Sequence, residues 1–323
     1  MRAIILEGFG GPDKLVYRDI PEPEPMEGHV VIEVKAFGLN HAEMHMRRGE
    51  WAENADVIGI ECVGIVKSCP GGEFPVGARV AAMMGGMGRT INGSYAEYTR
   101  VPVNVVTLIE ADLSWAELAA LPETYATAWT CLFGALELQA GQTLLIRGAT
   151  SAFGQAAVNL AVDAGATVIA TTRSRERFAM LAALGASRCA IEAPDLSRHL
   201  SEDVKLDCIL DLVGNSVIVD SLSMLRRNGR ACIAGWLGGL DPVKDFNPLA
   251  QMNSGVFLTF FASFHFGTPG FPVSEVPLTE IARKAAAGRF KAKPSRVFSF
   301  DEIHEAHRIM EANEAGGKMV VVL

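Results

Sequence analysis

A strand, a turn, a helix and a second strand follow one another in the middle of the chain, and this pattern constrains the fold most. Thr143–Arg147 and Thr167–Thr172 are short apolar runs typical of buried strands. Phe153–Ala164, between them, has small and apolar residues at helical spacing. Two strands joined by a helix in this order predict a parallel pair with a crossover connection.

The alternation of strand and helix continues after this first unit. Further strands are expected at Leu206–Val213, Arg230–Ala234 and Val256–Phe261, and further helices at Arg175–Leu184, which ends at Gly185, and Asn215–Leu225. This order predicts an α/β fold in which a doubly wound parallel sheet is covered by helices on both faces.

The two ends of the chain have a different pattern. About 120 N-terminal residues are rich in strand signals and turns, and indicate a small barrel or sandwich, with strands expected at Arg2–Leu6, Val30–Ala36, Val63–Lys67, Ala78–Met83 and Tyr95–Val101. Near the C-terminus, Ser299–Glu302 forms a capping box before a helix at Ile303–Glu314, and Lys318–Leu323 is a final strand. A chain of 323 residues exceeds what one core usually serves, so we expect two domains.

Composition excludes several classes of function. The formal net charge is −8, with both signs interspersed, and no basic cluster long enough to follow a nucleic acid is present. The N-terminus lacks the apolar core of a signal peptide, and Val256–Phe266 is about half the length of a membrane span. The six cysteines form no C-x-x-C pair, which favours reduced thiols. We therefore expect a cytoplasmic protein without nucleic-acid or membrane partners.

The turn after Thr143–Arg147 is a candidate dinucleotide-binding loop. Gly148 to Gly154 follow a strand and open a helix, and small residues there let the backbone approach a pyrophosphate near the positive end of the helix dipole. A strict G-x-G-x-x-G pattern would require glycine where Ala149 and Ser151 stand. An ordinary strand-to-helix turn is the alternative, but a second strand about 20 residues later favours the cofactor.

The end of that second strand indicates which cofactor is bound. NAD-preferring sites usually place an acid there to bind the ribose, whereas this chain has Thr172, Arg173, Ser174 and Arg177. Guanidinium groups form charge-assisted, bidentate hydrogen bonds with phosphate, so the 2′-phosphate of NADPH would suit them. Solvated arginines on a surface turn are the alternative. A methyltransferase would also be expected to have a ribose-binding acid at this position, so its absence argues against that class of enzyme.

Several motifs in a fixed order extend the pattern over nearly the whole chain. They are Gly38-Leu39-Asn40-His41-Ala42-Glu43, Gly59-Ile60-Glu61-Cys62-Val63-Gly64, Gly93-Ser94-Tyr95-Ala96-Glu97-Tyr98, Ala126-Thr127-Ala128-Trp129, Ser299-Phe300-Asp301-Glu302-Ile303 with Ala306-His307, and Gly317-Lys318-Met319-Val320-Val321. In this order the chain resembles the medium-chain dehydrogenase/reductase superfamily, and within it the zinc-independent quinone oxidoreductase (zeta-crystallin-like) branch.

The resemblance implies a domain arrangement. A GroES-like domain would comprise residues 1–120 completed by 263–323, and a Rossmann domain would comprise residues 121–262. The family's nicotinamide and substrate lie between two such domains, and its members are commonly dimers or tetramers, so we expect a homodimer.

The resemblance also implies site residues. Asn40 would lie beside the nicotinamide or the substrate, Thr127 near the nicotinamide ribose, and Lys318 at the closing end of the site. The remaining cofactor contacts would be Ser151, Ala152 and Phe153 at the pyrophosphate, and Val213, Gly214, Ala234, Gly235, Trp236, Phe260, Phe261 and Ala262 after later strands.

Zinc is not expected. Asn40 and Ile60 stand where the alcohol-dehydrogenase branch has a Cys and a His ligand, and the four-cysteine lobe for structural zinc is missing. His41 and His45, with Glu43 between them, do not form H-E-x-x-H, and are interpreted as polar residues of a loop or helix edge. His304 and His307 are interpreted as surface residues.

Three departures from the family bear on the substrate. His45 and Trp51 stand where relatives often have tyrosines, and Glu192 stands at the position of a tyrosine that would stack near the adenosine. His45 is a candidate proton donor, and Trp51 and Phe261 are candidate pocket residues that could equally be core residues.

A metal-free site of this kind predicts hydride transfer from NADPH to a quinone or α,β-unsaturated carbonyl, acceptors that need little activation. A stand-alone enoyl reductase of a polyketide or lipid pathway, with a groove near Asp241–Phe271, and a non-catalytic NADPH-binding structural or sensor protein remain alternatives.

Overall fold

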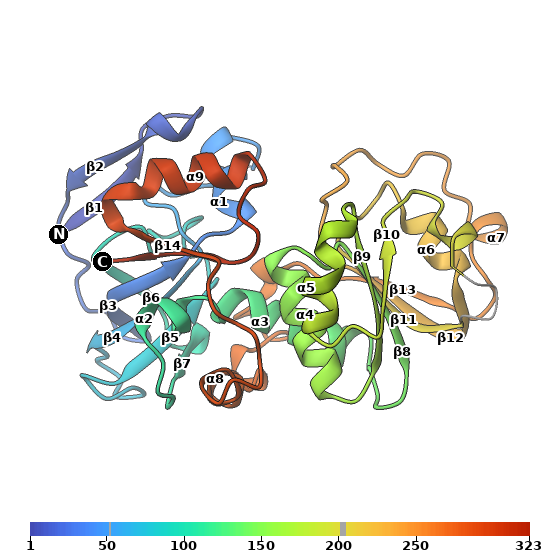
Figure 1. Cartoon of the computed structure of the whole chain (residues 1–323). Helices are drawn as coiled ribbons and strands as arrows, with labels where there is room; N and C mark the ends of the chain where they lie inside the picture. The colour runs from blue at the N-terminus through green and yellow to red at the C-terminus, as the bar shows by residue number, and fades with distance from the viewer. Residues whose placement is uncertain (52, 201–204) are drawn as a thin grey trace. The chain divides into compact units, whose positions relative to one another are not determined.

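The computed structural model describes residues 1–51, 53–200 and 205–323, and the chain divides into two compact units (Figure 1). The first unit comprises Met1–Ala126 and Ser263–Leu323, and the second comprises Thr127–Ala262. The first unit is therefore built from both ends of the chain, and the second from its middle.

The second unit is a parallel sheet of six strands in the order β10-β9-β8-β11-β12-β13. The strands are β8 (Thr143–Arg147), β9 (Thr167–Thr172), β10 (Arg188–Ile191), β11 (Leu206–Asp211), β12 (Leu225–Ile233) and β13 (Phe257–Phe260). Numbered from β8, the order is 3-2-1-4-5-6, the arrangement of dinucleotide-binding folds, which bind their ligand outside the carboxyl ends of the strands. The doubly wound parallel sheet expected from the sequence is thus confirmed.

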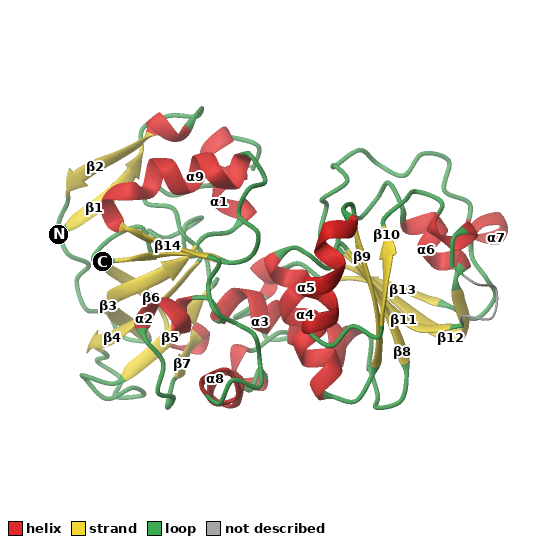
Figure 2. Ribbon diagram, in the orientation of Figure 1, coloured by secondary structure: helices red, strands yellow, loops and turns green. Residues whose placement is uncertain are grey.

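Helices flank this sheet on both sides (Figure 2). They are α4 (Ala152–Asp163), α5 (Phe178–Ala183), α6 (Ile218–Ser223) and α7 (Pro248–Gln251), with the C-terminal part of α3 (Pro122–Trp129) and a π-helical segment Thr130–Ala135 leading into β8. Two predicted helices are shorter than expected: Arg175–Leu184 consists of a 3-10 turn followed by α5, and Asn215–Leu225 contains only α6.

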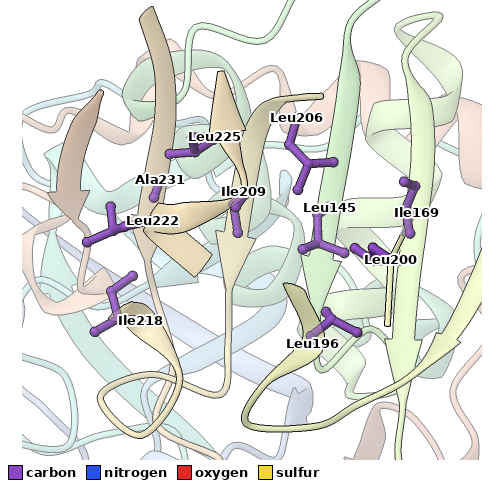
Figure 3. Close-up of a cluster of buried hydrophobic side chains, with 10 residues drawn as sticks. All are labelled: Leu145, Ile169, Leu196, Leu200, Leu206, Ile209, Ile218, Leu222, Leu225 and Ala231. Atoms are coloured by element: carbon purple, nitrogen blue, oxygen red, sulfur yellow. The ribbon is translucent and has the colours of Figure 1, made fainter. Parts of the chain in front are cut away.

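Alternate residues of the sheet build one side of the core (Figure 3). Leu145 of β8, Ile169 of β9 and Ile209 of β11 point to the same face because side chains alternate along a strand. Ile218 and Leu222 of α6 pack against this row. The next residue on the same face, two positions along each strand, lies at the carboxyl end of the strand.

The first unit is mainly antiparallel. Its larger sheet has the order β14-β15-β3-β4-β5-β7, with β6 paired to β3, and β1 and β2 form a separate pair. The strands are β1 (Arg2–Leu6), β2 (Leu15–Asp19), β3 (His29–Gly38), β4 (Glu61–Ser68), β5 (Arg79–Met83), β6 (Tyr98–Pro102), β7 (Val106–Leu108), β14 (Arg296–Ser299) and β15 (Met319–Val322), and the helices are α1 (His41–Arg48), α2 (Trp115–Ala119), α8 (Leu278–Ala286) and α9 (Ile303–Glu311). The tail joins the sheet because β15 pairs with β3.

Candidate functional site

The loop between β8 and α4 has the geometry that a pyrophosphate site requires. Gly148 adopts a left-handed backbone with φ of +78°, which favours glycine. Ser151 caps α4, because its Oγ accepts a hydrogen bond of 3.0 Å from the Gly154 N–H. A Cβ on Gly154 would lie 2.5 Å from Ala149 Cα, so the helix can start this close to the loop only with glycine there.

The N-terminal turn of α4 leaves donors available. Within the described residues, no acceptor is found for the backbone N–H groups of Ala152 and Phe153. Ser151, Ala152 and Phe153 are only half-buried. Two donors at the positive end of a helix fit the anionic pyrophosphate of a dinucleotide.

The turn after β9 presents three arginines to solvent. Thr172 ends the strand and is buried, and its Oγ1 accepts a 3.3 Å hydrogen bond from the Ser174 N–H. Arg173, Arg175 and Arg177 are exposed, and no described residue forms a side-chain hydrogen bond or ion pair with them. The sequence had singled out Arg173 and Arg177, and Arg175 adds a third guanidinium to the turn.

Buried polar side chains line the carboxyl ends of the strands on the α6 side. Arg147 is fully buried and paired with Asp211 in the strand register. Its guanidinium forms ion pairs with Glu192 and, at 3.0 Å, with Asp220. It also donates to the backbone oxygen of Ala193 at 2.6 Å. Sequence reasoning missed Arg147, although it stands two residues after the core residue Leu145 and therefore points to the same buried face.

Asp211 organises the loop that follows β11. Its carboxylate accepts hydrogen bonds from the N–H groups of Val213 at 3.0 Å and Gly214 at 2.8 Å, and from Ser221 Oγ at 2.8 Å. Burial raises the pKa of this carboxyl, whereas these hydrogen bonds oppose the rise. A Cβ on Gly214 would lie 2.6 Å from the Gly235 oxygen, so the predicted cofactor segments after β11 and β12 are adjacent.

The other residues predicted for the second unit differ in exposure. Ala234 is bonded to β11 through its N–H, which donates to Asp211 O at 3.0 Å. The rings of Trp236 and Phe260 are 6.2 Å apart, and Phe260 is about half exposed. Phe261 and Ala262 are buried, as is Thr127 of α3. Phe261 therefore has the burial of a core residue.

A buried polar cluster in the first unit surrounds Asn40. Lys318 Nζ donates to Glu61 Oε1 at 2.5 Å and to Asn40 Oδ1 at 2.6 Å. Asn40 Nδ2 donates to the same Glu61 oxygen at 2.9 Å, and Glu61 Oε2 accepts from the Glu123 N–H at 2.9 Å. A Cβ on Gly38 would lie 2.3 Å from Glu61 Oε1, so the cluster requires glycine on the neighbouring strand.

Glu43 also belongs to this cluster. It closes a capping box at the start of α1, where its Oε2 accepts from the Asn40 N–H at 2.8 Å, and its Oε1 accepts from the Ile60 N–H at 3.1 Å. Complete burial raises the pKa of Glu43 to about 7, while the charge of Lys318 opposes the rise. The Asn40 amide is thus held by a cation on one side and carboxylates on the other.

These donors do not fit a catalytic zinc. The positions that matched the Cys and His ligands hold Asn40 and Ile60, and Ile60 is buried without a metal-binding atom. The ammonium group of Lys318 lies where a cation among these oxygens would be. Over the described part of the chain, no group of three or more His, Cys, Asp or Glu is arranged to bind a metal.

His45 and Trp51 lie together near the C-terminus of α1. Their rings are 6.0 Å apart and nearly parallel, and His45 Nδ1 is paired with the exposed Glu50. The segment interpreted as a loop or helix edge is therefore the helix α1. Since Glu50 holds one ring nitrogen, Nε2 is the atom of His45 that could reach a substrate.

One expectation was wrong. His307 is not a surface residue: it is fully buried, with its Nδ1 accepting from Arg47 Nε at 3.3 Å and its Nε2 lying 3.0 Å from Tyr95 OH. Burial and the Arg47 charge lower the pKa of His307 to about 3, so the ring is neutral. Helical spacing could have revealed this, since His307 follows Ile303 by four residues and precedes Met310 by three.

Comparison with known proteins gives consistent results. The model of the alcohol dehydrogenase GroES-like domain matches residues 26–111, and that of the zinc-binding dehydrogenase family matches residues 165–321. A quinone oxidoreductase of Homo sapiens is 27% identical over 338 residues, which cover 100% of this chain and 98% of that protein.

Solved structures are similar over the full length. The quinone oxidoreductase from Coxiella burnetii has a TM-score of 0.84 and 25% identity, covering 100% of this chain and 99% of that one. An NAD-dependent alcohol dehydrogenase has a TM-score of 0.84 and 26% identity, covering 100% of both chains. No helix in the described ranges has the length and apolar character needed to cross a membrane.

Proposed function

The chain belongs to the medium-chain dehydrogenase/reductase superfamily of oxidoreductases, is quinone oxidoreductase-like, and binds a nicotinamide cofactor, and from this premise we propose that it reduces quinones or α,β-unsaturated carbonyls with NADPH and without zinc. The observation that carries the proposal is the turn after β9. Arg173 and Arg177 are exposed there and have no partner among the described residues, at the position where NAD-preferring sites have an acid.

The residues present fit such a cofactor. Gly148 and the free N–H groups of Ala152 and Phe153 would bind the pyrophosphate, and Arg173 with Ser174 would bind the 2′-phosphate. Reduced nicotinamide supplies a hydride when it is bound.

The first unit would contribute polar groups to the reaction. Asn40 is half-buried, and its amide is fixed by Lys318 and Glu61, so its orientation is set before a ligand arrives. Trp51 would offer an aromatic surface to a flat acceptor. His45, with Nδ1 held by Glu50, would present Nε2 as a proton donor.

Assembly and location are part of the same proposal. We infer a homodimer, argued below from the outer strand β13, and a cytoplasmic location, which the six free cysteines favour because reducing compartments keep thiols unpaired.

A panel of acceptors tests the proposed function. NADPH oxidation is followed at 340 nm with 9,10-phenanthrenequinone, with an enal and with buffer alone, each with and without EDTA. We expect turnover with the quinone or with both acceptors, and no effect of EDTA. NADPH binding without any turnover would instead indicate a structural or sensor protein. Turnover of the enal far above that of the quinone would indicate the enoyl-reductase alternative, and loss of activity in EDTA would contradict the metal-free site.

A further inference from the structure

An acidic residue that the sequence placed only near the adenosine stands beside the arginine turn. Glu192 directly follows β10, and its N–H donates a 2.9 Å hydrogen bond to the oxygen of Thr172, the last residue of β9. Arg173 and Ser174 are the first two residues after that strand. A carboxylate here would repel a 2′-phosphate, and it would be free to accept hydrogen bonds from the ribose hydroxyls of NADH.

The structure shows how this carboxylate is occupied. Oε1 of Glu192 accepts from Nε of Arg147 at 3.1 Å and also from its NH2 group, and Oε2 accepts from Thr171 Oγ1 at 2.5 Å. The side chain of Glu192 is 9% exposed and that of Arg147 is 0% exposed. Arg147 and Thr171, the two side chains that donate to Glu192, are both buried. The negative charge of Glu192 is therefore neutralised inside the second unit.

Arg147 is itself fixed by the fold. It ends β8, and its NH1 group contacts Asp220 Oδ2 and Ser221 Oγ of α6, each at 3.0 Å. Asp211, its neighbour in the strand register, is bonded to the same Ser221. Several acidic groups thus share one buried cation, and removing that cation would leave them uncompensated at the edge of the sheet where ligands bind.

We propose that Arg147 determines cofactor selectivity by masking Glu192, so that the turn at Arg173 and Ser174 presents only positive charge to the 2′-phosphate. The inference rests on the proposed use of NADPH. Arg147 does not touch the cofactor in this scheme; it is a positioning residue that acts through Glu192. A purely structural role for Arg147 would lower the affinity for NADPH and NADH alike.

A double-mutant cycle separates masking from other roles. Dissociation constants for NADPH and NADH are measured by calorimetry for the wild type, Arg147→Met, Glu192→Gln and the double variant. Arg147→Met should shift the ratio of the two constants against NADPH by about tenfold, equivalent to about 1.4 kcal/mol. In the Glu192→Gln background the same change should shift the ratio by less than about threefold, because the carboxylate beside the arginine turn is no longer there to be unmasked.

Two results would overturn the inference. An equal fall in both affinities would make Arg147 a structural residue only, and an equal shift of the ratio in both backgrounds would mean that Arg147 attracts the phosphate directly. Should Arg147→Met fail to fold, the cycle is repeated in an Asp220→Asn background, which removes a second carboxylate that Arg147 compensates.

A matched control comes from the opposite end of the sheet. Arg226 forms an ion pair with Asp207 near the amino ends of β12 and β11, so Arg226→Met should leave the ratio unchanged. A preference of the wild type for NADH would refute the proposed cofactor but not the masking, since the cycle compares changes in a ratio.

Discussion

Single charged residues set the expected cofactor preference of this protein. Arg173 and Arg177 are exposed at the end of β9, and no described side chain compensates them. Replacing both by alanine should raise the dissociation constant for NADPH by about 10- to 100-fold, since each charge-assisted hydrogen bond contributes about 1.5–3 kcal/mol and exposure reduces that value. Calorimetric titration should show an unchanged affinity for NADH. An equal loss for both cofactors would remove the basis of the assignment.

Lys318 makes a different kind of contribution, to the stability of the first unit. Glu61 and Lys318 are both buried, and Lys318 supplies the charge that offsets Glu61. Lys318→Met should lower the free energy of unfolding by about 3–5 kcal/mol, because it leaves a buried carboxylate without its cation. Urea unfolding measures this loss. The double variant Lys318→Met/Glu61→Gln should recover most of it, and a double variant no more stable than the single one would contradict the pairing.

Sequence patterns identified positions better than they identified partners. Arg173 and Ser174 could be selected because they follow a predicted strand, whereas Asn40 was implied by the family resemblance. Nothing in the spacing indicates that Glu192 would be paired with Arg147, 45 residues away, because that contact depends on the order of the strands in the sheet.

Elements bounded by strong local signals were predicted to the residue. Thr143–Arg147 and Thr167–Thr172 match β8 and β9 because a glycine stands two residues before each short apolar run and polar or glycine residues follow it. The helix expected at Asn215–Leu225 is limited to Ile218–Ser223. Its first residues instead form a turn in which the Val217 N–H donates to the oxygen of Gly214 at 3.0 Å, and Gly214 is itself held by Asp211 through a tertiary contact that propensity does not report.

The helix α9 is anchored by a neutral histidine, which predicts a dependence of stability on pH. The folded pKa of His307 is about 3, below its ordinary value of 6.5, so between these values the unfolded chain binds a proton that the folded chain does not. The free energy of unfolding should therefore fall as the pH drops below 6.5, by about 2 kcal/mol at pH 5 from this residue. Urea unfolding of the wild type and of a variant without His307, each between pH 7 and pH 5, measures this contribution as the difference between the two pH profiles.

A variant comparison isolates this contribution. His307→Gln should lose less stability between pH 7 and pH 5 than the wild type does, because glutamine does not titrate. His29→Gln, at the start of β3 in the same unit, is the matched control and should follow the wild type. Equal slopes for His307→Gln and the wild type would refute the neutral, buried ring. Glu43, whose pKa is raised to about 7, acts in the opposite direction between about pH 4.5 and 7, and is common to all three proteins.

At the scale of the molecule, each large sheet ends in outer strands that have one partner among the described residues. In the second unit these strands are β10 and β13, and β13 pairs with β12 and carries the exposed side chains of Phe257, Leu258 and Phe260. In the first unit β14 is such a strand, and its Val297 is exposed. Natural proteins protect such edges with charges or cover them, and the apolar edge is β13.

The proposed homodimer follows from the exposed apolar side chains of β13. A second copy could add its own β13 across a two-fold axis, which would pair the free backbone groups and bury the aromatic side chains. Phe261 N–H bonds to β12 at 3.0 Å, so by alternation the N–H groups of Phe260 and Leu258 point outward. Leu258→Lys would place a charge at the centre of that junction.

Light scattering after size exclusion should therefore give twice the 34.6 kDa chain mass for the wild type, and the mass of one chain for Leu258→Lys. Val297→Lys, on the outer strand β14, should remain dimeric and controls for a general effect of an added lysine. A monomeric wild type would refute the dimer. A dimer that is disrupted by Val297→Lys but not by Leu258→Lys would instead place the interface at β14 of the first unit. That outcome is not expected, because Phe298, the aromatic residue of β14, is buried.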